Sequence, residues 1–134
     1  MSDVMRKFMV VILAILVLVV ACNSTNDVQL GAGENGRHMD VRKGQVLVVT
    51  LESNPTTGYR WEVASATEGI LKQRGESEYV QGNPDNNLLG YGGAETFRFD
   101  VIGTGEANLK LIYHRTFEQG VAPAQTYEVA MTAR

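Results

Sequence analysis

The chain has 134 residues, which suggests one domain, and its 44% hydrophobic residues are enough to build a core. Its net charge is −3 and it has no block of like charges, which argues against a nucleic-acid binder because such proteins carry a basic stripe. Fourteen glycines against three prolines suit a β-rich domain with many tight turns.

The first 21 residues have the pattern of a bacterial secretion signal. Arg6 and Lys7 precede an apolar run over residues 8–21, which is shorter than the roughly 20 residues that span a bilayer as a helix. The run ends in the sequence VVAC, which resembles a bacterial lipobox, whose cysteine is lipidated and becomes the new N-terminus. We therefore expect residues 1–21 to be a lipoprotein signal peptide and a lipid on Cys22 to hold the protein on a membrane. The plainer alternative is a signal-peptide cysteine without a role.

Cys22 is the only cysteine, so the chain can form neither an internal disulfide nor a cysteine metal cluster. Asn23 follows it, and in the Gram-negative sorting convention an Asp there would retain a lipoprotein in the inner membrane. We therefore expect an extracytoplasmic lipoprotein, on the outer membrane or the periplasmic face of a Gram-negative bacterium. Residues 22–36 are polar and contain glycine, which predicts a flexible tether in front of a domain over residues 37–134.

From residue 37 onward, short runs with alternating apolar side chains are separated by turn residues, which is the pattern of an all-β protein. In the third run Trp61 falls on the same side as Tyr59 and Val63, so we expect it in the core. No run has sustained helical periodicity. Strands are predicted at 38–42, 45–52, 59–65, 70–80 (as one or two edge strands), 95–101, 106–114 and 126–133. About seven strands fit an immunoglobulin-like β-sandwich, with a small barrel as the alternative.

Three connections are longer or richer in turn residues than the others, at 54–58, 83–93 and 115–123. In an antiparallel sandwich alternate connections share one end, so we expect these three to lie together. The connection at 103–105, by contrast, is only Gly-Thr-Gly and falls at the other end. Because elaborated loops on a rigid scaffold commonly carry binding residues, we predict a binding edge at one end of the domain.

The contents of these loops resemble the chagasin-type inhibitors of cysteine peptidases, and the resemblance covers residues 37–134. The first loop has the full family motif, Asn54-Pro55-Thr56-Thr57-Gly58. The second has the Gly-x-Gly-Gly motif of the family as Gly90-Tyr91-Gly92-Gly93. The third begins with Arg115 and Phe117 but has Thr116 where the family has Pro, which leaves this loop less constrained.

The residues of the first loop predict a stiff wedge. Pro55 fixes its own φ, Gly58 permits the positive φ that closes the loop, and the two threonines are restricted at χ1. The resemblance implies that Thr56 and Thr57 sit over the active site of a papain-like peptidase and that the other two loops flank it. The peptidase-binding residues that it implies are Asn54, Pro55, Thr56, Thr57, Gly58, Gly90, Tyr91, Gly92, Gly93, Arg115 and Phe117.

Each motif also has a plainer interpretation. Residues 54–58 fit an ordinary turn, the glycine-rich motif fits a surface loop, and Phe117 fits a core residue folded under its own loop. A phosphate-binding role for the glycines is disfavoured, because no helix N-terminus or P-loop Lys follows them. His38 and His114 are distant in sequence and have no cysteine partner, so we expect both on the surface and no metal site.

The function that we predict is reversible inhibition of papain-family cysteine peptidases, with three loops blocking the active-site cleft. We expect no enzymatic activity, because the folded domain has no nucleophile elbow, HExxH motif or catalytic thiol, and Glu76 and Glu78 fit a solvated face. We expect a monomer without cofactors and without a nucleic-acid partner. The alternative is a structural or ligand-binding envelope lipoprotein that has no peptidase target.

Overall fold

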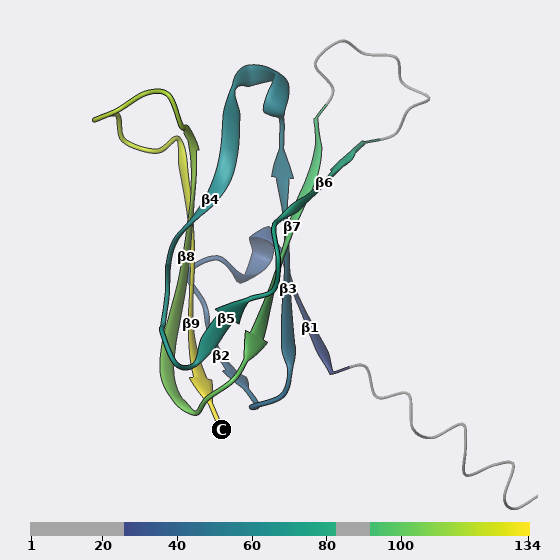
Figure 1. Ribbon diagram of the computed structural model, residues 1–134, viewed down its shortest axis with the longest axis vertical. Coiled ribbons are helices and arrows are strands. Elements are labelled where there is room, and N and C mark those ends of the chain that lie inside the picture. Colours follow the sequence, from purple (N-terminus) through teal and green to yellow (C-terminus); the bar gives the residue numbers. More distant parts are fainter. Residues whose placement is uncertain (1–25, 83–91) are drawn as a thin grey trace, which may run out of the picture.

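The computed structural model describes residues 26–82 and 92–134, which form two β-sheets packed face to face (Figure 1). The first sheet contains β1 (Asp27–Leu30), β3 (Val46–Ser53), β7 (Gly93–Val101), β5 (Leu71–Gln73) and β6 (Glu78–Gln81). The second contains β2 (His38–Val41), β9 (Gln125–Ala133), β8 (Gly105–Arg115) and β4 (Tyr59–Ala66). Two single-turn 3₁₀ helices, η2 (Ala32–Glu34) and η3 (Pro55–Thr57), interrupt the strands. The all-β, immunoglobulin-like β-sandwich is therefore confirmed, with nine strands in the described residues.

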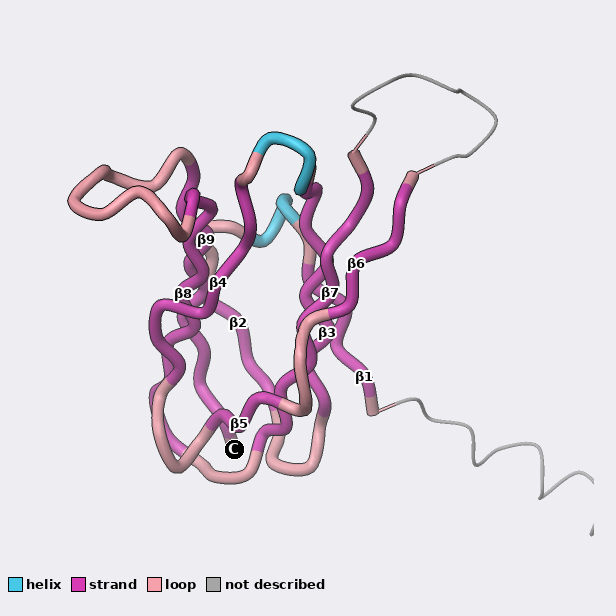
Figure 2. Tube along the Cα trace, turned by 45° about the horizontal axis from the view of Figure 1, so that its top comes forward, coloured by secondary structure: helices cyan, strands magenta, loops and turns pink. Residues whose placement is uncertain are grey.

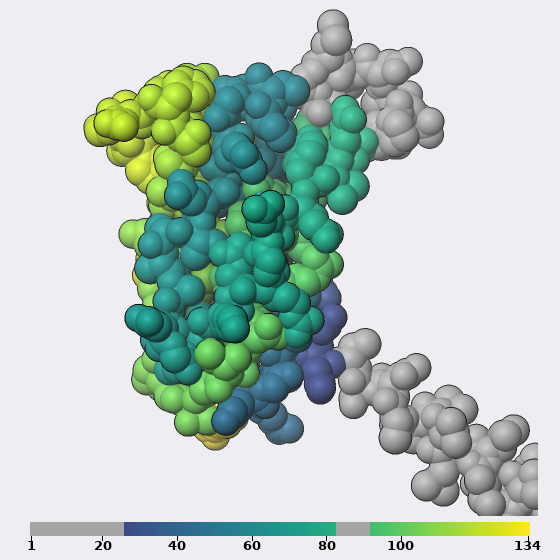
Figure 3. Space-filling view, viewed as in Figure 1, coloured from purple at the N-terminus to yellow at the C-terminus, as the bar shows by residue number. Residues whose placement is uncertain are grey.

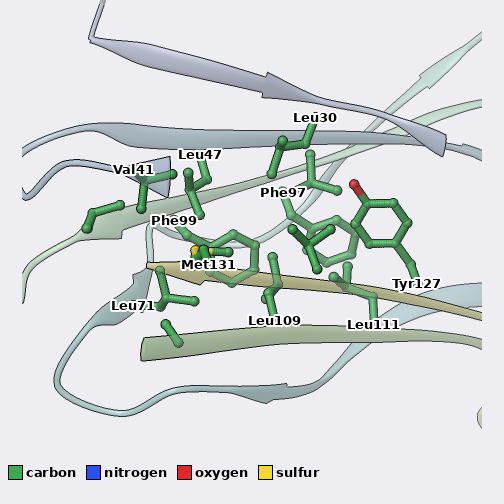
Figure 4. Close-up of a cluster of buried hydrophobic side chains, with 14 of the residues drawn as sticks. Leu30, Val41, Leu47, Leu71, Phe97, Phe99, Leu109, Leu111, Tyr127 and Met131 are labelled. Carbon is green, nitrogen blue, oxygen red and sulfur yellow. The ribbon is translucent and has the colours of Figure 1, made fainter. Parts of the chain in front are cut away.

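The core lies between the two sheets and consists of the inward side chains of alternating strands (Figure 4). In β7, Phe97 and Phe99 are at most 3% exposed while their neighbours are more accessible, as the alternation predicts. The facing sheet contributes Leu109, Leu111 and Met131, each fully buried. Trp61 is only 6% exposed and packs into the same cluster, so its expected core position is confirmed.

Strand β1 lies in the segment that the sequence indicated as a flexible tether. Asp27–Leu30 pairs in parallel with β3, and Leu30 is 3% exposed within the core. The Tyr127 hydroxyl donates a hydrogen bond to the Gly31 carbonyl oxygen, 3.0 Å away, which fixes the chain after β1. The tether prediction is therefore wrong for Asp27–Glu34, and the ordered domain begins before residue 37. The polar composition of this segment predicted a tether because the burial of Val28 and Leu30 depends on pairing with a distant strand, which local periodicity does not show.

The two ends of the sandwich differ in their connections (Figure 2). One end carries the 54–58 turn, the β8–β9 loop and the paired ends of β6 and β7, where the Gly82 amide donates to the Gly92 carbonyl oxygen. The other end carries the close turns at 42–45, 67–70 and 102–104. We call the first end the loop pole and the second the turn pole.

Residues 1–25 and 83–91 lie outside the described residues, and with them the predicted signal peptide, Cys22, Gly90 and Tyr91. Within the described ranges, no helix is both long enough and apolar enough to cross a bilayer. No group of three or more His, Cys, Asp or Glu side chains in those ranges is placed to hold a metal ion.

Candidate functional site

The wedge, residues 54–58, is a single 3₁₀ turn closed by its own hydrogen bonds. Gly58 has φ +82°, the left-handed region that glycine tolerates best, and its amide donates to the Pro55 carbonyl oxygen at 3.0 Å. The Thr56 hydroxyl donates to Oδ1 of Asn54 at 2.6 Å, and the Thr57 hydroxyl donates to the Asn54 carbonyl oxygen, also at 2.6 Å. Both hydroxyl protons are thus used inside the wedge. The Thr57 oxygen also accepts a long hydrogen bond from the Tyr59 amide, at 3.4 Å. Toward a partner, the exposed threonine oxygens offer their remaining lone pairs as acceptors.

Arg115, at the end of β8, braces the wedge from the neighbouring loop. Its Nε donates to the Thr57 carbonyl oxygen at 3.1 Å, and one terminal guanidinium nitrogen donates to Oε1 of Glu118 at 2.9 Å. Its Cζ lies 4.5 Å from the centre of the Tyr59 ring, within cation–π range. The hydrogen bond to Glu118 is the main reason that the pKa of Arg115 is raised above its ordinary value. The planar guanidinium therefore makes three contacts inside the domain.

Phe117 stands against the wedge but in solvent. A Cβ atom built on Gly58 would lie 3.1 Å from Cε1 of Phe117, so the ring covers the glycine closely. The side chain is nevertheless 71% exposed, which rules out the interpretation of Phe117 as a core residue. Val121, in the same loop, is 60% exposed. Val121 belongs to the third predicted loop, but nothing in the residues around it distinguished it as a site residue.

Gly92 and Gly93 lie where strands approach too closely for a side chain. A Cβ on Gly92 would come within 2.8 Å of the Ser53 carbonyl oxygen and 3.3 Å of the Asn54 Cβ. A Cβ on Gly93 would come within 2.0 Å of the Val80 carbonyl oxygen. Both glycines thus have a structural reason that is independent of any partner. They also bring the start of β7 against the base of the wedge.

Tyr113 supports the wedge from beneath, and it is not among the site residues predicted from the sequence. Its hydroxyl oxygen accepts a hydrogen bond from the Asn54 amide at 3.0 Å. Its ring stacks on Tyr59, with centroids 5.3 Å apart, and lies 5.1 Å from the Trp61 ring. The sequence feature that could have identified Tyr113 is its position, on the inward face of a long predicted strand and two residues before the third loop. The aromatic stack connects the wedge to the rigid core.

A groove of about 640 Å³ opens beside the wedge. Its walls come from the ends of β3, β6, β7, β8 and β9. The lining residues include Ser53, Asn54, Val80, Gly92, Tyr113 and Gln125. Ser53 is 4% exposed, and its hydroxyl is the one buried side-chain polar atom in the described part of the chain without a hydrogen-bond partner. The loop pole therefore combines a projecting wedge with an adjacent hollow (Figure 3).

Of the predicted site residues, Asn54 to Gly58, Gly92, Gly93, Arg115 and Phe117 are brought together at the loop pole. Gly90 and Tyr91 lie outside the described residues. His38 and His114 have different partners. His38 lies beside Glu106 and Thr132, and Nε2 of His114 lies 2.6 Å from Oε2 of Glu62 on the outer face. The expectation that both histidines are surface residues agrees with these contacts.

Comparisons with known proteins agree with this architecture. Chagasin from Trypanosoma cruzi is 31% identical over 103 residues, which cover 74% of this chain and 91% of chagasin. The crystal structure of EhICP2, a cysteine protease inhibitor from Entamoeba histolytica, superposes with a TM-score of 0.70 at 18% identity, covering 81% of this chain and 96% of that one. PbICP-C, solved in complex with falcipain-2, gives a TM-score of 0.52 at 20% identity over 81% of this chain and 98% of its own. Residues 40–131 match the family described as Chagasin family peptidase inhibitor I42. The chain therefore belongs to the chagasin family of peptidase inhibitors.

Proposed function

We propose that this protein is a reversible, competitive inhibitor of papain-family cysteine peptidases, which it blocks with the loops at 54–58, 83–93 and 115–123. The observation that carries the proposal is the bracing of the wedge by Arg115 and Tyr113, because a preformed loop loses little conformational entropy on docking. The family match supports the inhibitor class. The target class is supported by EhICP2, a cysteine protease inhibitor, and by PbICP-C, which is in complex with falcipain-2.

The wedge suits a narrow catalytic cleft for a chemical reason. A papain-like cleft places a thiolate and an imidazolium on opposite walls, and the imidazolium is the hydrogen-bond donor. The Thr56 and Thr57 hydroxyls donate to Asn54, so a remaining lone pair on these exposed oxygens could accept a hydrogen bond from that imidazolium. A 3₁₀ turn also does not present an extended peptide in the geometry that nucleophilic attack requires. The wedge would thus occupy the cleft without being cleaved.

The flanking loops supply side chains of the types that dominate binding energy. Phe117 is 71% exposed and stands next to the wedge, and aromatic residues are enriched among interface hot spots. Val121 adds a second exposed apolar side chain in the same loop. An edge of this kind would bury about 1,600 Å² in total, the standard size of a protein–protein interface.

We also propose that the mature protein is a lipoprotein attached to a membrane through Cys22, on the outer membrane or periplasmic face of a Gram-negative cell. The support is the VVAC sequence after a short apolar run, followed by Asn23. The mass of the chain purified from a bacterial membrane tests this proposal. A diacylglyceryl group on Cys22 supports it, and an unmodified Cys22 on a cleaved chain contradicts it.

Titration of papain with residues 22–134 tests the inhibitory function. We expect stoichiometric loss of activity that is recovered on dilution, and competition with substrate. Full activity of papain and of a cathepsin L-like enzyme at micromolar protein would contradict the proposal. That outcome would favour a structural or ligand-binding lipoprotein, for which the groove beside the wedge would be the site to probe.

A further inference from the structure

The described chain begins at the turn pole, opposite the wedge. The Asn26 carbonyl oxygen accepts a hydrogen bond from the Val46 amide at 3.0 Å, and Asp27 pairs with Val46 at the start of β3. Because β1 and β3 are parallel, both strands run from the turn pole toward the loop pole (Figure 1). Strand β3 ends at Ser53, directly before the wedge. The whole length of β3 thus separates Asn26 from the wedge.

The distance between these points exceeds the reach of the chain that precedes Asn26. Only three residues separate Cys22 from Asn26. Four residue steps span at most about 14 Å even when fully extended. The eight residues of β3 extend for about 26 Å. A membrane anchor at Cys22 therefore cannot place the loop pole against the bilayer with the turn pole pointing away.

The turn pole carries cationic, acidic and apolar side chains that would lie nearest the headgroups. Arg42 and Lys43 are adjacent and exposed in the β2–β3 turn. The Lys43 amide donates to the carbonyl oxygen of Arg134, which brings a third cation to this end. Ile102, 43% exposed, lies in the neighbouring turn. The acidic side chains at this end are Glu68, exposed in the 67–70 turn, Asp27 at the start of β1, Glu106 near the start of β8, and Asp40, 3.9 Å from Arg134. They offset the cations, so the orientation follows from the length of the anchor and not from net charge.

We propose that the lipid-anchored protein rests with its turn pole on the membrane and presents the wedge away from the bilayer, so that it inhibits peptidases without being released. This orientation rests on the proposed lipidation of Cys22 and on the proposed inhibitory role of the wedge. It also explains how Phe117 and Val121 remain exposed on a membrane protein, since the short anchor keeps them out of their own bilayer. A wedge about 26 Å from the surface lies well beyond the roughly 8 Å Debye length.

Fluorescence quenching on vesicles tests the orientation. Single cysteines replace Thr104, exposed in the turn pole, or Gln81, exposed at the loop-pole end of β6, in the full lipidated chain. Acylation consumes the Cys22 thiol, so each variant carries one reactive thiol for a fluorophore. The chains are reconstituted in phosphatidylcholine–phosphatidylglycerol vesicles that contain a headgroup-labelled nitroxide lipid. We expect at least several-fold stronger quenching at position 104 than at position 81. Equal quenching, or stronger quenching at position 81, overturns the proposal.

Papain titration on the same vesicles provides a second readout. The unlabelled, vesicle-bound chain is expected to inhibit papain with the same stoichiometry as the chain in detergent. Inhibition that appears only after detergent is added overturns the proposal, because the wedge must then face the bilayer. A chain that fails in detergent as well would contradict the inhibitory function itself. A chain whose Cys22 carries no lipid by mass would overturn the anchored orientation and leave soluble inhibition unaffected.

Discussion

Arg115 and Thr57 are joined by a hydrogen bond from Nε to the carbonyl oxygen, 3.1 Å long, across two loops that are 58 positions apart in sequence. The bond links the tip of the wedge to the base of the β8–β9 loop. The same guanidinium lies over Tyr59 and pairs with Glu118. Arg115, which the family motif implies is a peptidase contact, therefore also stabilises the conformation of the wedge.

Replacing Arg115 with Lys tests whether inhibition depends on the contacts of the guanidinium or only on its positive charge. A Lys ammonium keeps the charge but cannot reproduce the planar stack on Tyr59 while also donating to Thr57 and Glu118. We expect the inhibition constant for papain to rise about tenfold. Because the side chain is partly exposed, the midpoint of urea unfolding should change little. The matched control is Arg98→Lys, which affects only the surface pair with Glu78. An unchanged inhibition constant for Arg115→Lys would show that bracing does not matter.

Tyr113→Phe removes one hydroxyl and keeps the aromatic stack. The Asn54 amide then loses its partner at the base of the wedge. We expect about 1 kcal/mol of lost stability in urea unfolding and faster dissociation from papain. Tyr79→Phe, on a tyrosine 40% exposed in β6, is the control that should leave both quantities unchanged. If dissociation from papain stays at the original rate while stability falls, Tyr113 supports the fold alone.

Thr57→Asp introduces a charge at the wedge tip. The charge would be desolvated in the cleft, and it meets no such cost in the free protein because residue 57 is exposed. We expect at least a hundredfold weaker inhibition and a small fall in melting temperature, because a carboxylate cannot donate to the Asn54 carbonyl oxygen as the Thr57 hydroxyl does. Thr57→Ser keeps the hydroxyl that donates to Asn54 and is expected to inhibit almost normally. Full inhibition by Thr57→Asp would place residue 57 outside the active site.

Tyr127 gives the fold an alkaline limit. Burial raises the pKa of its phenol to about 12 from an ordinary value of 10.0, with a smaller contribution from Glu34. Between these values the unfolded chain releases the proton and the folded protein retains it, so stability is complete below about pH 10 and falls as pH rises toward 12. The loss on completing this change is on the order of 2 kcal/mol. Urea unfolding at pH 9, 10 and 11 measures the slope. Tyr127→Phe should have a shallower slope, and an identical slope would mean that another group dominates.

The strands were predictable because each has a face that repeats every second residue. Phe97 and Phe99 in β7 illustrate this, since apolar and polar residues alternate in the sequence and buried and more exposed residues alternate in the strand. The shape of the wedge was also predictable, because Pro55 and Gly58 restrict the backbone locally. Strand β1 was not, because its parallel pairing with β3 depends on residues 19 positions away. The roles of Tyr113 and Arg115 in support of the wedge were hidden for the same reason, since both contacts cross between loops distant in sequence.

Protection of the catalytic thiol measures occupation of the cleft most directly. Papain is mixed with an equimolar amount of residues 22–134, and the rate at which a small alkylating reagent modifies its catalytic cysteine is followed by mass spectrometry. We expect alkylation to slow in proportion to the fraction of papain bound, and we expect Thr57→Asp to restore the original rate. Alkylation at the unhindered rate in a complex that demonstrably forms would contradict it, because the wedge would then lie outside the cleft.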